Sequence, residues 1–156
     1  FATSTDNLDP TDPLAVWRQF QWVSNELTSP KVLVCNSDNR SKSSNWDETD
    51  NDQGYTGNNN LSYFYGRDAD EGKPQTILTG DRNMIRGTGT PQSTLSFDRA
   101  GSDEAGWHTT IHVRAGNLGL ADGSAQQASE SALKKQVLAA YESPGIDGDI
   151  DLYFPQ

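Results

Sequence analysis

The sequence contains one cysteine, Cys35, in a chain of 156 residues. A single cysteine cannot form an intrachain disulfide, so no cross-link of that kind supports the fold. Cys35 ends the apolar run Val32-Leu33-Val34-Cys35, which predicts that its thiol is buried as a small hydrophobic group. A catalytic thiol needs a base and an electropositive setting, and the neighbouring sequence indicates neither.

Basic residues are also scarce. The chain has 12 lysines and arginines against 22 aspartates and glutamates, which gives a net charge of −10. This charge argues against binding to nucleic acid or to anionic membrane surfaces, because both attract basic patches. We expect a solvated acidic surface, and cation binding or a basic protein partner are compatible alternatives.

Long apolar runs are missing as well: the sequence contains no signal peptide and no membrane span. Hydrophobic residues make up 33% of the chain, so one domain over residues 1–156 is expected to have a lean core in which aromatic side chains supply much of the buried area. The chain opens at Phe1 without an initiating methionine. We therefore expect it to be the trimmed part of a longer protein.

The stretch from Trp107 to Ala128 predicts three short antiparallel strands joined by two tight turns. Apolar and polar residues alternate over 107–114, which is typical of a half-buried strand. Asp122-Gly123 is a strong hairpin signal, because primed turns need positive φ at both central positions. The expected order is strand 107–114, a turn at Ala115-Gly116, strand 117–121, the turn at Asp122-Gly123 and strand 124–128.

These turns fix the register of the three strands. The residues expected on the buried face are Ile111, Leu120 and Ala125, with Val113 and Leu118 beside them. The row expected on the opposite face is His112, Gly119 and Gln126. His112 would then lie over a residue without a side chain, which leaves room for its imidazole.

The rest of the chain predicts an α+β fold around this sheet of hairpins. A helical stripe from Leu14 to Leu27, with Asp12 and Pro13 at its start, predicts an N-terminal helix whose aromatic face packs on the sheet. A second helix is expected after Ser129 or Ser131 and through Glu142. Further strands are expected at 31–35, 61–65, 75–79, 84–86, 93–97 and 150–154, with a long polar loop over 36–60.

Two histidines suggest a site. His108 and His112 lie four residues apart, hence on one face of the expected strand, and with Asp122 they could form a zinc site or an acid–base pair. However, the expected register puts Asp122 inside a turn, about three residue steps or roughly 10 Å from His112. Turns favour Asp for reasons of backbone geometry, so we expect no catalytic and no metal site here.

Three acidic clusters invite a calcium interpretation, but none fits the EF-hand loop. They are Asp47 to Asp52, Asp68 to Glu71 and Asp147 to Asp151. Solvated turn carboxylates are expected, with calcium at one acidic loop as the open alternative. No other cofactor is expected.

His112, nine intervening residues and Asp122-Gly123 resemble the His-(nine residues)-Asp-Gly motif of bacterial prepilin-type, pseudopilin-like proteins. The surrounding GNLGLADGSAQQ is similar to that family's glycine-asparagine, apolar run and Ala-Asp-Gly hairpin. Ser62 to Asn83 resembles the family's central strand pair, and Pro30 to Arg40 resembles its Cys-Pro-Ser-Asp block, with Asn36 in place of the proline. The likeness covers roughly Val16 to Val137 in order.

The resemblance implies a pilin-like head domain, a non-catalytic structural subunit of a type II secretion or type IV pilus-like pseudopilus. It implies a missing leader and a long apolar N-terminal helix as the only membrane contact, on the periplasmic side of the bacterial inner membrane. The implied partners are other pseudopilin subunits and secretion-system components. His112, Asp122 and Gly123 would be structural, and the fragment alone is expected to be monomeric.

Two alternatives from other classes remain open. One is an extracytoplasmic binding module for a glycan or protein ligand, using the 36–60 loop and the aromatic residues Trp46, Tyr55, Tyr63 and Tyr65. The other is a metal-dependent hydrolase using His108, His112 and Asp122. An apolar stretch of about 20 residues upstream of Phe1, preceded by a short basic leader, would favour the structural subunit.

Overall fold

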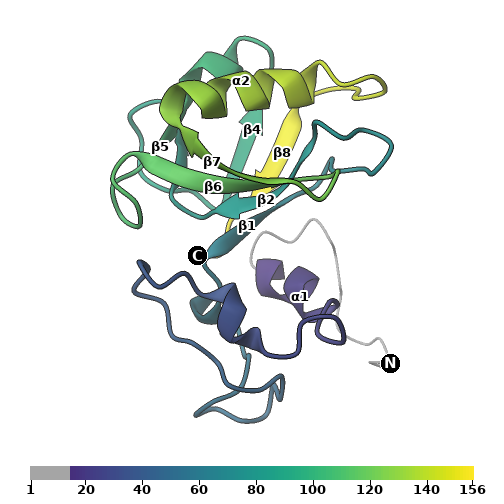
Figure 1. Ribbon diagram of the computed structural model, residues 1–156. Helices are drawn as coiled ribbons and strands as arrows, with labels where there is room; N and C mark the ends of the chain where they lie inside the picture. Colours follow the sequence, from purple (N-terminus) through teal and green to yellow (C-terminus); the bar gives the residue numbers. More distant parts are fainter. Residues whose placement is uncertain (1–14) are drawn as a thin grey trace.

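A six-stranded antiparallel sheet forms the centre of the molecule (Figure 1). The computed structural model describes residues 15–156. In spatial order the strands are β4 (Thr94–Phe97), β8 (Ile150–Tyr153), β1 (Tyr63–Gly66), β2 (Ile77–Asp81), β6 (Ala115–Leu120) and β7 (Ala125–Ser129). A separate two-stranded ladder pairs β3 (Met84–Arg86) with β5 (Ala105–Trp107). The expected mixed fold, with helices on an antiparallel sheet, is confirmed.

The helix α2 (Glu130–Tyr141) covers one face of this sheet (Figure 1). The side chain of Ser129 caps it by accepting a hydrogen bond from the backbone N–H of Ala132, as Ser residues at this position commonly do. Its apolar stripe enters the larger core together with residues of the sheet, namely Leu133, Val137, Ala140, Phe64, Leu118 and Leu152. The C-terminal helix that the sequence predicted is therefore confirmed.

The N-terminal segment covers the opposite face of the sheet (Figure 1). It contains α1 (Val16–Gln21) and two short 3-10 helices, η2 (Pro30–Leu33) and η3 (Asn58–Asn60). A third 3-10 helix, η4 (Gly101–Glu104), precedes β5. Side chains alternate between the two faces of a strand, so tyrosines of β1 and β8 meet the N-terminal segment in a second, aromatic-rich core of Val16, Leu33, Tyr55, Leu61 and Tyr153, with Tyr63 and Tyr65 packed against it.

Two predictions about this segment are wrong. The first helix ends at Gln21 rather than Leu27, and Trp22 and Val23 after it are 59% and 41% exposed. The predicted strand at 31–35 is instead η2, because Pro30 stands at its first turn and the hydroxyl of Ser29 accepts a hydrogen bond from Lys31 N–H. The expected cap at Asp12 and Pro13 lies outside the described residues.

No helix within residues 15–156 combines the length and apolar character needed to cross a membrane.

The predicted strand at 107–114 is also wrong. β5 ends at Trp107, residues 108–114 form a loop, and β6 begins where a turn was expected at Ala115-Gly116. The buried amide of Asn83 holds both ends of this loop, since its Nδ2 donates hydrogen bonds to the carbonyl oxygens of His108 and Ala115. Val113, expected in the core, is 86% exposed.

The hairpin at Asp122-Gly123 is confirmed, but its register is shifted. Gly119 pairs with Ala125, whereas the prediction paired Leu120 with Ala125. The reason is that the turn has three residues, 121–123, instead of the expected two. Leu120 N–H donates a hydrogen bond to the carbonyl of Ser124 and closes this longer turn. The predicted row of His112, Gly119 and Gln126 therefore does not form.

Candidate functional site

Three residues from distant parts of the chain meet at one end of β2. Cys35 follows η2, Asp81 ends β2, and His112 lies in the loop before β6. His112 Nε2 is 3.6 Å from Cys35 Sγ and 3.5 Å from Asp81 Oδ2. One potential ligand atom of each residue lies within 4.8 Å of those of the other two. Across residues 15–156, no other group of three His, Cys, Asp or Glu side chains converges in this way.

The carboxylate of Asp81 is fully buried, with 0% of the residue exposed. Its Oδ2 accepts hydrogen bonds from the backbone N–H of Asn117 at 2.7 Å and from the side-chain Nδ2 at 2.9 Å. Its Oδ1 has no hydrogen-bond partner within the described chain. Burial raises the pKa of Asp81, although the Asn117 hydrogen bonds and the neighbouring His112 act in the opposite direction.

A second buried charge lies next to this group. Arg82 Nε and Nη2 donate to the two carboxylate oxygens of Asp38 at 2.7 and 2.6 Å, and the Asp38 side chain is 1% exposed. Ser62 links the pair to Cys35, because its hydroxyl donates to Asp38 and accepts a hydrogen bond from Cys35 N–H. Burial alone would raise the pKa of Asp38, but the hydrogen bonds from Arg82 and Ser62 and the charge of Arg82 lower it overall.

The loop that carries His112 is held by packing as well as by Asn83. Trp107 is 3% exposed. A Cβ atom placed on Gly116 would lie only 2.5 Å from the Cζ3 atom of the Trp107 ring. Only glycine at 116 lets the indole pack this closely on β6. The loop therefore leaves β5 and enters β6 through fixed ends.

The site residues predicted from the sequence are thus separated. His112 belongs to the group with Cys35 and Asp81. His108 faces another part of the surface, and Asp122 lies at the tip of the β6–β7 hairpin, where it accepts a hydrogen bond from Ser124 N–H at 2.9 Å. Hydrogen bonding from the side chain of Ser124, and then from its backbone N–H, lowers the pKa of the Asp122 carboxyl. Gly123 beside it has a φ of +82°. The structure does not bring together the hydrolase set of His108, His112 and Asp122.

Sequence reasoning missed Cys35 and Asp81, and it assigned no base to the thiol. The imidazole that contacts the thiol belongs to His112, 77 residues away. The usable signal was that each residue lies in a block of the pseudopilin-like resemblance: Cys35 in 30–40, Asp81 in 62–83, and His112 in the motif itself.

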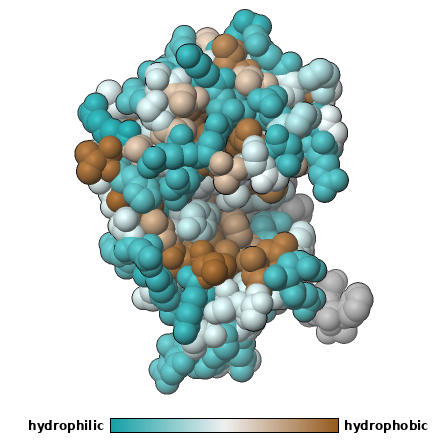
Figure 2. All heavy atoms as spheres, in the orientation of Figure 1, coloured by the Kyte–Doolittle hydropathy of each residue, from teal (hydrophilic) through white to brown (hydrophobic). Residues whose placement is uncertain are grey.

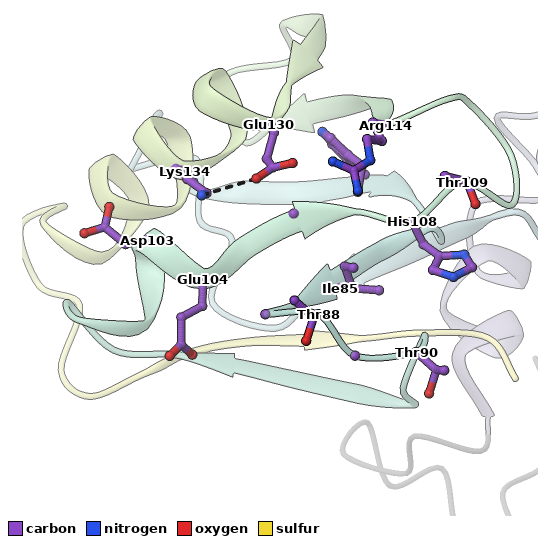
Figure 3. Close-up of a pocket in the computed structure, with 14 residues that line it drawn as sticks. Ile85, Thr88, Thr90, Asp103, Glu104, His108, Thr109, Arg114, Glu130 and Lys134 are labelled. Carbon is purple, nitrogen blue, oxygen red and sulfur yellow. Dashed lines mark ion pairs between the residues drawn. The ribbon is translucent and has the colours of Figure 1, made fainter.

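His108 lines a different hollow, of about 660 Å³, between the start of α2 and the loop after β3. Figure 3 shows Glu130 and Lys134 of α2 paired across its upper side, with Thr88 and Thr90 below. Two buried polar atoms at this hollow, Trp107 Nε1 and His108 Nδ1, have no hydrogen-bond partner among the described residues. The hollow itself is lined by polar side chains, among them Thr88, Thr90 and Glu104.

The aromatic residues of the 36–60 loop are occupied by packing. Tyr55 is 0% exposed, its hydroxyl donates to the carbonyl of Trp17, and its ring makes edge contacts with Trp17 and Trp46. Trp46, Tyr63 and Tyr65 pack partly buried against the same core. They do not form an open aromatic platform for a glycan.

The acidic loops use their carboxylates for turns and ion pairs. Asp50 accepts hydrogen bonds from Asn45 and from the backbone of Asp52 and Gln53, and further examples are the pairs Asp70–Lys73 and Asp151–Arg67. Within the described ranges, no three of these carboxylates converge on one point.

Comparison with protein-family models, with curated proteins and with solved structures finds no match for this chain.

Proposed function

We propose that this chain is the head domain of a pilin-like structural subunit in a type II secretion or type IV pilus-like pseudopilus, and that it is not catalytic. The observation that supports the proposal is that residues from all three blocks of the pseudopilin-like resemblance meet in this fold. Block 30–40 contributes Cys35 and Asp38, block 62–83 contributes Asp81 and Arg82, and the motif contributes His112. These residues join the N-terminal segment to the sheet, which is a structural task.

The geometry around His112 argues against nucleophilic catalysis by Cys35. In a catalytic triad the carboxylate holds one ring nitrogen and the nucleophile contacts the other. Here Cys35 Sγ and Asp81 Oδ2 both approach Nε2. Asp81 therefore cannot orient the imidazole toward the thiol as a triad requires.

A partly apolar surface supports contact with neighbouring subunits. The exposed apolar residues Trp22, Val23 and Leu78 lie around a hollow of about 430 Å³ beside α1 and β2. Figure 2 shows hydrophobic side chains gathered where the N-terminal segment meets the sheet. Other pseudopilin subunits are the proposed partners, on the periplasmic side of the inner membrane. Because the charge of −10 opposes self-association, the chain alone should sediment as a monomer at micromolar concentration.

The test is made in the source cells with the complete gene product carrying a C-terminal tag. We expect the protein in the membrane fraction and in filaments released by shearing. A photo-crosslinking residue in place of Leu78 should join it to other filament subunits, whereas the same residue in place of Lys135, exposed on α2, should give fewer such products. A protein that is absent from sheared filaments and forms no subunit crosslinks would contradict the proposal.

A second candidate is a binding module, and the hollow at His108 is the observation that favours it. Its polar lining, with Thr88, Thr90 and Glu104, suits a small polar ligand, and Trp107 also lines it. Screening sugars and short peptides by nuclear magnetic resonance would detect it through shifts of the Trp107 indole N–H. The absence of any shift at millimolar ligand would remove this candidate.

A further inference from the structure

We propose that Cys35, Asp81 and His112 bind one zinc ion, which fastens the N-terminal segment to the sheet. Zinc takes ligands at about 2.3 Å for sulfur, 2.0–2.1 Å for nitrogen and 2.0–2.2 Å for oxygen, in tetrahedral geometry. Those bond lengths place sulfur and nitrogen about 3.6 Å apart, and nitrogen and oxygen about 3.4 Å apart. The corresponding separations here are 3.6 Å and 3.5 Å.

The charge of the site favours a divalent cation. Asp81 is a fully buried carboxylate, and its Oδ1 has no hydrogen-bond partner within residues 15–156. Arg82, the adjacent cation, is engaged with Asp38. A zinc ion with the Cys35 thiolate and the Asp81 carboxylate makes a neutral group, which removes the cost of burying an uncompensated charge.

Neighbouring polar groups position two of the three ligands, as is usual in metal sites. Asn117 donates two hydrogen bonds to Asp81 Oδ2, and Ser62 fixes the backbone N–H of Cys35. The site is accessible from solvent, because the His112 side chain is 26% exposed and Cys35 lines a hollow of about 440 Å³ together with Tyr63 and Lys42. We assign the fourth zinc position to a water molecule. The inference does not depend on assembly, so either proposal can fail alone.

The experiment uses the purified chain, reduced and prepared without chelators. Elemental analysis should find one zinc per chain. After zinc removal, Co²⁺ should bind in a 1:1 ratio and give the near-ultraviolet charge-transfer band of a thiolate ligand and the visible bands of tetrahedral cobalt. Zinc should also raise the melting temperature and slow the alkylation of Cys35 by iodoacetamide.

Variants separate this site from adventitious binding. Cys35→Ser should abolish the charge-transfer band, and His112→Ala should weaken zinc binding by more than about 100-fold, since even supporting residues of metal sites are worth about 10–100-fold. His108→Ala and Asp122→Asn are the matched controls and should keep full binding. Cobalt titration of the unaltered chain tests the site even if a variant fails to fold. Absence of the thiolate band there, or zinc that survives both Cys35→Ser and His112→Ala, would overturn the proposal.

Discussion

Replacing Arg82 by methionine should be among the most damaging single changes in the part of the chain that joins the N-terminal segment to the sheet. The substitution keeps an unbranched side chain but removes both hydrogen bonds from the guanidinium to Asp38. The Asp38 carboxylate, 1% exposed, would then stay buried with only the Ser62 hydroxyl and the Asn39 N–H as donors.

Breaking a buried ion pair by removing one partner costs about 3–5 kcal/mol, and the two remaining donors favour the lower end. For a domain of this size, about 3 kcal/mol lowers the melting temperature by roughly 6–12 °C. Arg67→Met is the matched control, because its pair with Asp151 is exposed, with side-chain exposures of 51% and 24%. Exposed pairs contribute about 0–1 kcal/mol. Urea denaturation of both variants gives the comparison directly.

The pH dependence supplies an independent check. The folded pKa of Asp38 lies below its ordinary value, so its contribution to stability is present above the unfolded pKa and is lost as pH falls through the folded pKa. In Arg82→Met, the guanidinium no longer opposes the effect of burial on Asp38, so the folded pKa of Asp38 rises. The stability difference between the native chain and Arg82→Met should therefore shrink in acid, and Asp38→Asn/Arg82→Met should recover part of the loss at neutral pH. Equal effects of Arg82→Met and Arg67→Met at neutral pH would refute this reasoning.

Three further changes have defined expectations. Gly116→Ala should lower the free energy of unfolding by about 1–3 kcal/mol in urea denaturation, because the new Cβ would lie 2.5 Å from the Trp107 ring. Gly57→Ala is the control: nothing lies within 4 Å of its Cβ, so stability should change by less than about 0.5 kcal/mol. Gly123→Val places a β-branched residue at a φ of +82° and should cost about 1–2 kcal/mol; an unchanged melting temperature would contradict the turn. Leu133→Ala should cost about 2–5 kcal/mol, since Leu133 is 0% exposed, and a loss below 1 kcal/mol would mean that α2 is not packed on the sheet as described.

Features encoded by neighbouring residues could be predicted from the sequence. The helix after Ser129 has its cap and its apolar stripe in one stretch, and the structure has both. The hairpin at Asp122-Gly123 and the closing strand β8 likewise rest on residues close in sequence. Local chemistry decides such elements, because capping, turn geometry and side-chain periodicity all act over a few residues.

Features that depend on distant residues could not be predicted. The alternation over 107–114 is typical of a strand, yet Asn83, more than 20 residues upstream, ties the ends of that segment as a loop. The run before Cys35 looked like a buried strand, but Ser29 and Pro30 start a 3-10 turn that exposes Val32. The meeting of Asp81 with His112 depends on how β2 pairs with β6, which periodicity within either strand does not encode. Cys35 reaches them from the segment after η2, which is distant in sequence from both strands.

The spacing within the His-(nine residues)-Asp-Gly motif has a structural explanation in this fold. The nine intervening residues are Val113 and Arg114, the six residues of β6, and Ala121. Six strand residues span roughly 20 Å, so His112 and Asp122 stand at opposite ends of one strand and cannot share a catalytic centre. His112 is fixed at one end beside Cys35 and Asp81, and Gly123 fixes the other end through its positive φ. Between them, Leu118 and Leu120 must both face the core, and shifting a strand by one residue moves its core side chains to the opposite face. Inserting or deleting one residue in the motif would therefore turn these leucines away from the core or displace one of the two anchors.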